Sequence, residues 1–120
     1  MANELSLGFS LGLSKSGGAI SRGYNAQVNV SGIPYLAGDG LATLAGAYVD
    51  LGSVANIGQI AIKHLSENST ANYLYVGTSG GAYQFALKPG EWVNGRWNLA
   101  AVHVLPDAGQ AYFEYLVVSQ

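Results

Sequence analysis

Two histidines are the residues best suited to metal or acid–base chemistry. His64 and His103 are the only histidines of the 120-residue chain, which contains no cysteine. Each falls inside a segment that we predict to be a strand, and neither has a second histidine at ligand spacing. With Asp39 or Glu67 they would supply the ligands of a metal-dependent, cupin-type enzyme if they met across the fold. Two unrelated, half-exposed strand histidines are the simpler interpretation, so we predict no metal and no cofactor.

The carboxylates are scattered singly along the chain. Glycoside hydrolysis needs two carboxylates that flank the scissile bond, and isolated positions do not indicate such a pair. Asp39 and Asp107 stand near glycine in turn-like contexts, where a carboxylate commonly accepts bonds from backbone amides. The glycine-rich stretch 77–81 lacks the lysine and the helix of a phosphate-binding loop. We therefore predict no catalytic residues and a protein that is not an enzyme.

Aromatic side chains offer the remaining binding chemistry. Trp92 and Trp97 lie five residues apart around a predicted turn, where they would form a sugar-stacking platform or a subunit contact. Several tyrosines fall in predicted strands, where aromatic rings normally pack across neighbouring strands. These tyrosines are Tyr73, Tyr75, Tyr83 and Tyr112. A carbohydrate-binding module and a subunit interface both remain open at this point.

The chain is unusually poor in charge. Charged residues make up 10% of it, against about 25% in a typical soluble domain, and the net charge is −2. With so few lysines and arginines, the chain has no basic patch of the kind that binds nucleic acid. No apolar run approaches the ~20 residues of a membrane helix. A net charge near zero favours association, so we expect neither nucleic acid nor membrane as partner, but other protein subunits.

The N-terminal segment has the pattern of a strand with two different faces. Its bulky residues alternate with serine and glycine, and this period of two is typical of a strand. A face nearly free of side chains suits close approach by another backbone. We therefore predict that residues 1–13 form a strand or arm exchanged with a neighbouring subunit. The predicted interface residues in this segment are Leu5, Leu7, Phe9 and Leu11; those elsewhere are Trp92 and Trp97.

The rest of the chain alternates between short apolar runs and turn signals. After residues 5–13, we predict strands at 24–30, 46–51, 58–65, 73–77, 82–88, 91–93, 99–105 and 111–118. The "AGDG" stretch at 37–40, the Pro89-Gly90 pair and "NGRWN" at 94–98 are predicted turns or loops. Turn signals every 8–12 residues predict an all-β fold, an antiparallel β-sandwich or jelly roll of eight or nine short strands. The length predicts a single domain over residues 1–120.

Six pieces of the second half occur in an order and spacing that resemble small structural proteins of tailed bacteriophages. The resemblance covers roughly residues 46–120. The pieces are Asp50-Leu51-Gly52, Gly58, Lys63-His64-Leu65, Val76-Gly77, Leu87-Lys88-Pro89-Gly90-Glu91 and Glu114-Tyr115-Leu116-Val117-Val118.

This resemblance implies a virion component built on a β-sandwich. Such a subunit would decorate or cement the capsid by binding the major capsid protein, or would belong to a tail or a head fibre. By the same analogy it would form a homo-oligomer. A trimer on the local three-fold positions of a shell is the favoured form. A stable contact buries on the order of 1,200–2,000 Å², and few charges reduce the number that must be desolvated inside it.

Overall fold

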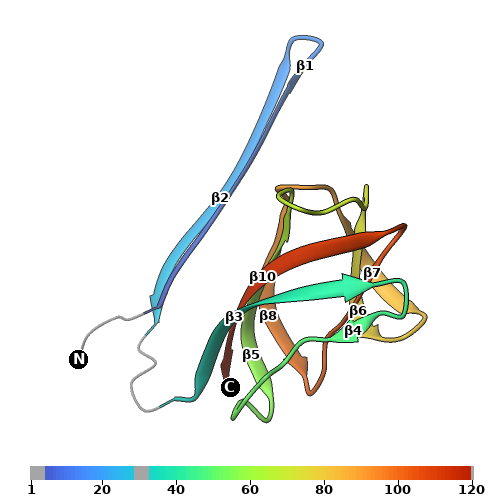
Figure 1. Cartoon of the computed structure of the whole chain (residues 1–120). Coiled ribbons are helices and arrows are strands. Elements are labelled where there is room, and N and C mark those ends of the chain that lie inside the picture. The colour runs from blue at the N-terminus through green and yellow to red at the C-terminus, as the bar shows by residue number, and fades with distance from the viewer. Residues whose placement is uncertain (1–4, 29–32, 120) are drawn as a thin grey trace. The chain divides into compact units, whose positions relative to one another are not determined.

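The computed structural model describes residues 5–28 and 33–119, which form an all-β structure (Figure 1). The chain divides into two compact units, Met1–Ile33 and Pro34–Gln120. The described ranges hold ten strands and no helix, which confirms the predicted all-β class. Accordingly, a search of these ranges for a membrane-spanning helix finds none.

The first unit is a long hairpin. Strands β1 (Leu5–Lys15) and β2 (Gly18–Val28) pair antiparallel without interruption, from Leu5 opposite Val28 to Lys15 opposite Gly18. The two-residue loop Ser16-Gly17 has φ of 53° and 80°. Positive φ at both positions is the type I′ turn, whose twist matches the flanking strands. The predicted break after Leu13 is therefore the tip of a hairpin.

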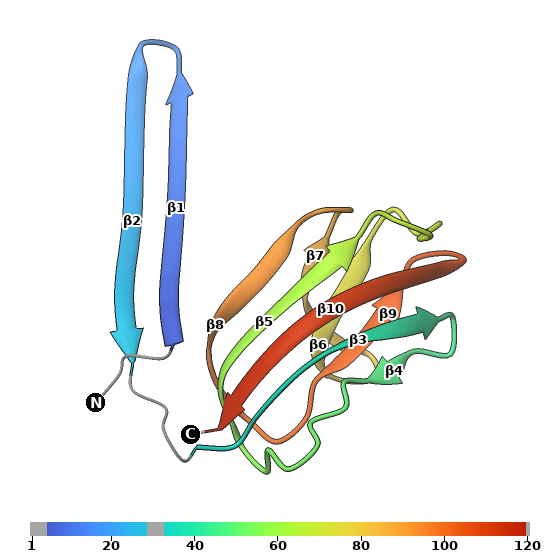
Figure 2. The same cartoon turned by 60° about the vertical axis from the view of Figure 1, so that its left-hand side comes forward.

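The second unit is a sandwich of two four-stranded sheets. One sheet has the order β3-β10-β5-β8 and the other β4-β9-β6-β7, all pairs antiparallel. Within it, every connection except the β6–β7 hairpin leads from one sheet to the other, which is the jelly-roll arrangement. Figure 2 shows the first sheet from its broad side. The strands are β3 (Tyr35–Thr43), β4 (Ala47–Tyr48), β5 (Ile57–Leu65), β6 (Leu74–Ser79), β7 (Ala82–Leu87), β8 (Trp92–Leu99), β9 (His103–Pro106) and β10 (Gln110–Ser119).

Alternation along the central strands builds the core between the sheets. In β5 and β10 every second residue is buried, as the period-two pattern predicts. The opposing sheet contributes its own buried positions from β6 and β9. The fully or nearly fully buried side chains include Ile60, Ile62, Phe113 and Val117 on the first sheet and Leu74, Val76 and Val104 on the second.

Strand β3 contradicts the predicted turn at 37–40. Gly38 and Gly40 lie in the middle of this strand, opposite Tyr115 and Phe113 of β10. A Cβ atom at Gly40 would collide with the Phe113 ring, and one at Gly38 would lie 3.0 Å from the Tyr115 hydroxyl oxygen. The aromatic rings thus occupy the space that side chains of β3 would fill. Such aromatic cover stabilises glycine in a strand, where its missing side chain is otherwise unfavourable.

Further boundaries differ from the prediction. The predicted strand 24–30 begins earlier, at Gly18 of β2, and its last two residues lie outside the described residues. The predicted turn at 94–98 is wrong, because residues 92–99 form one strand, β8, held by pairing with β5. Cross-strand pairing here overrides the local preference of asparagine and glycine for turns. The predicted strand 46–51 shrinks to β4, and the one at 99–105 begins only at His103. The Pro89-Gly90 turn is confirmed: it joins β7 to β8 across the two sheets, with Gly90 at a φ of 90°.

Replacing Gly40 by alanine tests the aromatic cover on β3. The new methyl group would meet the buried Phe113 ring, with a Cβ–Cε1 distance of 2.8 Å before relaxation. We expect Gly40→Ala to lower the free energy of unfolding by about 1–3 kcal/mol, the usual cost of overpacking. The measurement is urea unfolding followed by tryptophan fluorescence.

Gly95→Ala in β8 of the same sheet is the matched control. Its added Cβ would meet only Trp97, at an ordinary van der Waals distance of 3.4 Å. We expect a change within about 0.5 kcal/mol. Equal destabilisation by the two substitutions would contradict the proposed role of the Phe113 ring.

Candidate interaction surfaces

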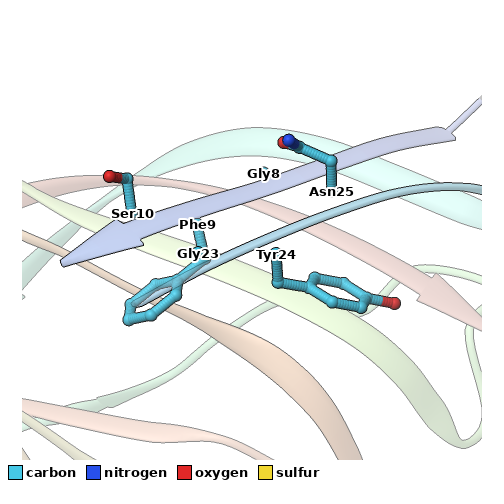
Figure 3. Close-up of a pocket in the computed structure, with 6 residues that line it drawn as sticks. All are labelled: Gly8, Phe9, Ser10, Gly23, Tyr24 and Asn25. Atoms are coloured by element: carbon cyan, nitrogen blue, oxygen red, sulfur yellow. The ribbon is translucent and has the colours of Figure 1, made fainter. Parts of the chain in front are cut away.

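The four predicted interface residues of the N-terminal segment lie on one face of the hairpin. Residues directly opposite in an antiparallel pair share a face, so β2 adds its own side chains to this row. Figure 3 shows Phe9 and Tyr24 on one side of the hairpin and Ser10 and Asn25 on the other. The residues we call the apolar hairpin face are Leu5, Leu7, Phe9, Leu11, Leu13, Ile20, Tyr24 and Ala26.

Most of the apolar hairpin face is open to solvent. The exposed fraction is 49% at Phe9, 61% at Leu11 and 58% at Tyr24, and Leu13 and Ile20 are similarly exposed. Leu5 and Leu7 are partly buried. Arg22, opposite Leu11, is a charged residue within this face, and its guanidinium donates to the Ser21 carbonyl oxygen at 2.9 Å. The strand that carries Tyr24 and Ala26 was predicted from sequence, but its pairing with β1 was not, although two alternating runs flanking Ser16-Gly17 are a hairpin signal.

The opposite face of the hairpin carries glycine, serine and polar amide residues, including Asn25 and Gln27. Gly8 and Gly23 leave a shallow hollow, lined also by Phe9, Ser10, Tyr24 and Asn25 (Figure 3). Because glycine has no side chain, another backbone can come close to the strands here. The two faces of the hairpin therefore differ in both bulk and polarity.

Trp92 lies on the outer face of the β3-β10-β5-β8 sheet. Its side chain is 49% exposed, and the Lys63 ammonium lies 5.4 Å from the centre of its ring. A hollow beside it is lined in part by Asp39, Glu114 and Tyr115. Asp39 and Glu114 are cross-strand neighbours, and Glu114 is also opposite Lys63. Asp39 therefore lies in a strand rather than in the predicted turn.

Trp97 lies on the other side of β8. It packs against the core and stacks on Phe85, with ring centroids 5.5 Å apart and an interplanar angle of 16°. Since residues 92–99 are one strand, Trp92 and Trp97 point to opposite faces of it. The structure does not bring the two tryptophans together into one platform.

His64 is a structural residue of the Lys-Pro-Gly-Glu corner. Its side chain is fully buried, and its Nδ1 lies 2.9 Å from the Leu87 carbonyl oxygen. Its backbone N–H donates to the Glu91 carbonyl, and its own carbonyl accepts from the Gly90 N–H. The Glu91 carboxylate in turn accepts from the Lys88 N–H at 2.7 Å. His64 thus fastens the crossing between the sheets to the end of β5.

His103 is also buried, so the prediction of two half-exposed histidines is wrong. Its environment differs from that of His64. It lies on β9, where its Nδ1 is 2.8 Å from the Tyr83 hydroxyl oxygen and its ring meets Tyr48 edge-on at 4.7 Å. The structure therefore does not bring the two histidines to one site. In the part of the chain that the structure describes, no group of three or more histidine, aspartate or glutamate side chains could hold a metal ion.

A row of aromatic rings crosses the outer face of the β4-β9-β6-β7 sheet. Successive ring centroids are 4.7, 5.7, 6.1 and 6.3 Å apart. The terminal rings are the more exposed, at 61% for Tyr48 and 36% for Tyr73. The row as a whole is not visible in the sequence, because it depends on the pairing of β4 with β9. The rings, in order, are those of Tyr48, His103, Tyr83, Tyr75 and Tyr73, and we call them the tyrosine row.

Asp107 confirms the turn role expected of it, although its partners are distant in sequence. One of its carboxylate oxygens accepts from the backbone N–H groups of Asn72 and Tyr73, at 2.9 and 3.1 Å. Its own N–H donates to the Tyr73 carbonyl. These bonds tie the 66–73 loop to the turn before β10.

Burial raises the pKa of the Tyr115 phenol, and the carboxylates of Asp50 and Asp39 raise it further. All three causes disfavour the phenolate, because it would lose hydration and face like charges. The neutral phenol is therefore the form that the fold accommodates beneath the Trp92 hollow.

We compared the chain with protein-family models, with curated proteins and with solved structures, and none of the three comparisons finds a significant match. Its function is therefore proposed from its own residues.

Tyr115 predicts a loss of stability in alkali. The folded-state pKa lies above the unfolded value of 10.0, so the stabilisation is complete below pH 10 and is lost as pH rises through the folded pKa. Across this range the unfolded chain releases its proton first, and the free energy of unfolding falls. We expect Tyr115→Phe to show a shallower fall between pH 9.5 and 11.5, measured by urea unfolding at each pH. An unchanged slope would contradict the assignment to Tyr115, and Tyr35→Phe, at an exposed tyrosine, is the control.

Proposed function

We propose that this chain is a non-enzymatic structural subunit of a bacteriophage virion, and that it decorates the capsid by binding the shell and its own copies. The observation that carries the proposal is the apolar hairpin face. A surface of this kind, attached to a jelly-roll unit, suits a subunit whose function is contact with other chains. Its partners would be the major capsid protein or other virion proteins, and its location the virion.

The physical basis is the cost of leaving this face in water. An isolated two-stranded hairpin is at best marginally stable, and packing against further strands stabilises it. Burial of apolar area contributes roughly 25 cal/mol per Å². Contact with another chain therefore stabilises the hairpin and the assembly together.

The low charge of the chain and the phage-like pieces of residues 46–120 add to this proposal. Few charges mean that few ions must lose water when the surfaces meet. Repeated copies on a shell strengthen attachment through avidity, even when each contact is weak. A homo-oligomer, with a trimer at each local three-fold position, fits such a lattice. A tail or head fibre is the alternative location within the same class.

Particle composition tests the proposal. Virions released by a bacterial strain that encodes the chain would be banded on a density gradient. The chain would be quantified by mass spectrometry against the major capsid protein. We expect a constant ratio across the particle band, corresponding to many copies per virion. Recovery of the chain in soluble lysate, with none in the particle band, would contradict the proposal. A constant ratio that persists in tail-less heads would favour capsid over tail.

A second candidate, a carbohydrate-binding module, is favoured by the tyrosine row. Its side-by-side rings give a long aromatic surface, and Tyr hydroxyls provide hydrogen-bonding groups along it. Trp92 and Trp97 do not contribute jointly, because they lie on opposite faces of β8.

Glycan-array binding tests this second candidate. We expect a glycan ligand to bind the native chain and to lose about tenfold or more in affinity on Tyr48→Ala, at the exposed end of the row. Tyr35→Ala, an exposed tyrosine on β3 of the other sheet, is the matched control and should retain binding. A flat array, or equal loss in both variants, would contradict it.

A further inference from the structure

We infer that the apolar hairpin face packs against the same face of a second copy of this chain. The inference goes beyond the proposed function, because it names the chain that covers this face and holds wherever the protein acts. It concerns a contact between copies, and the particle experiment above does not decide it.

Two hairpins placed face to face form the smallest arrangement that covers the apolar residues of both. Stacked sheets lie about 10 Å apart, so the side chains of the two faces can interdigitate. Each 11-residue strand is about 37 Å long at about 3.4 Å per residue, which gives a long, narrow contact. The pair is a four-stranded, two-layer structure, whereas each hairpin alone would be only marginally stable.

The area available fits a weak but specific interface. Five large side chains of this face are each about half exposed: Phe9, Leu11, Leu13, Ile20 and Tyr24. Together they present on the order of 500 Å² on each copy. Two such faces in contact bury about 1,000 Å², the lower bound for a biological interface. Leu5, Leu7 and Ala26 extend the contact at the base of the hairpin.

The order of side chains along the hairpin is complementary to itself. A two-fold axis that crosses the strands at the midpoint, beside Ser10 and Gly23, reverses the order of the rows in the second copy. The row of Leu7 and Ala26 then faces the row of Leu13 and Ile20. A small residue thus meets a large one, which is how facing layers interdigitate.

The same axis gives Arg22 a partner. The Arg22 guanidinium comes to lie over the Tyr24 ring of the second copy, while Leu11 meets Phe9. A guanidinium over an aromatic face is a favourable pair when water is excluded. The two Arg22 side chains stay in different rows, so the like charges are kept apart. Because such a contact is isologous, it closes after two copies, and on a shell it would link neighbouring oligomers in pairs.

Analytical ultracentrifugation of the full chain tests the pairing. We expect the native protein to associate as its concentration rises: a monomer would form a dimer, and the proposed trimer would form larger assemblies linked in pairs. Leu11→Asp should raise the dissociation constant by about tenfold or more, because a carboxylate replaces a buried leucine. Gly12→Asp is the matched control: it makes the same change of charge at the next residue on the opposite face. No atom lies within 4 Å of a Cβ at Gly12. We expect its dissociation constant to stay within about twofold of the native value.

Single cysteines give a second readout that does not depend on a disruptive charge. The chain has no cysteine of its own, so one introduced thiol reports on one position. We expect a short bismaleimide to join copies of Leu11→Cys far more than copies of Gly12→Cys. Both tryptophans lie in the second unit, so their fluorescence checks that the sandwich is intact in every variant.

Three outcomes would overturn the inference. The first is a native protein whose mass does not rise with concentration. The second is cross-linking of Gly12→Cys as readily as of Leu11→Cys. The third is a monomer that co-sediments with phosphatidylcholine vesicles through this face, since lipid would then be its occupant.

Discussion

A sheet face lined with apolar side chains has to be removed from water, and this constraint shapes both units of the chain. In the sandwich, the inner faces of β5 and β10 are covered by those of β6 and β9, and the alternating residues between them form the core. The hairpin repeats the same alternation on β1 and β2, yet its large side chains remain about half exposed. The same physical rule that completes the sandwich therefore leaves the hairpin with a face to cover.

Sequence periodicity predicted the parts of this fold that depend on neighbouring residues. The alternation in 5–13, 58–65 and 111–118 marks the correct strands and the correct faces, because strand geometry alone sets the period of two. Strand β3 was read as a turn, since the aromatic rings that cover Gly38 and Gly40 come from the far end of the chain. The tyrosine row was likewise hidden, because it requires the register of β4 against β9. Both features depend on pairing between strands that are distant in sequence, and a local sequence pattern does not contain that information.

Two residues with potentially reactive side chains, His64 and Asp107, hold loops in place through hydrogen bonds. His64 holds the crossing from β7 to β8, and Asp107 holds the loop that precedes β6. In the loop beside Asp107, Thr70 and Ser69 accept from the backbone N–H groups of Gln110 and Tyr112. Such bonds satisfy the backbone groups of irregular segments, which would be costly to leave unpaired. The Asp107 carboxylate and the Nδ1 of His64 are engaged in these bonds, whereas the buried Nε2 of His64 has no hydrogen-bond partner.

The jelly-roll connectivity has a consequence for how the chain reaches its native state. Because nearly every connection of the sandwich changes sheets, neighbouring strands are far apart in sequence, and such topologies fold slowly, in milliseconds to seconds. The hairpin closes through a two-residue loop, and hairpins of this kind form within about 1–10 μs. A folding chain therefore exposes its apolar hairpin face long before the sandwich is assembled. The face that is left uncovered in the folded chain is therefore also the first one that other molecules can meet during folding.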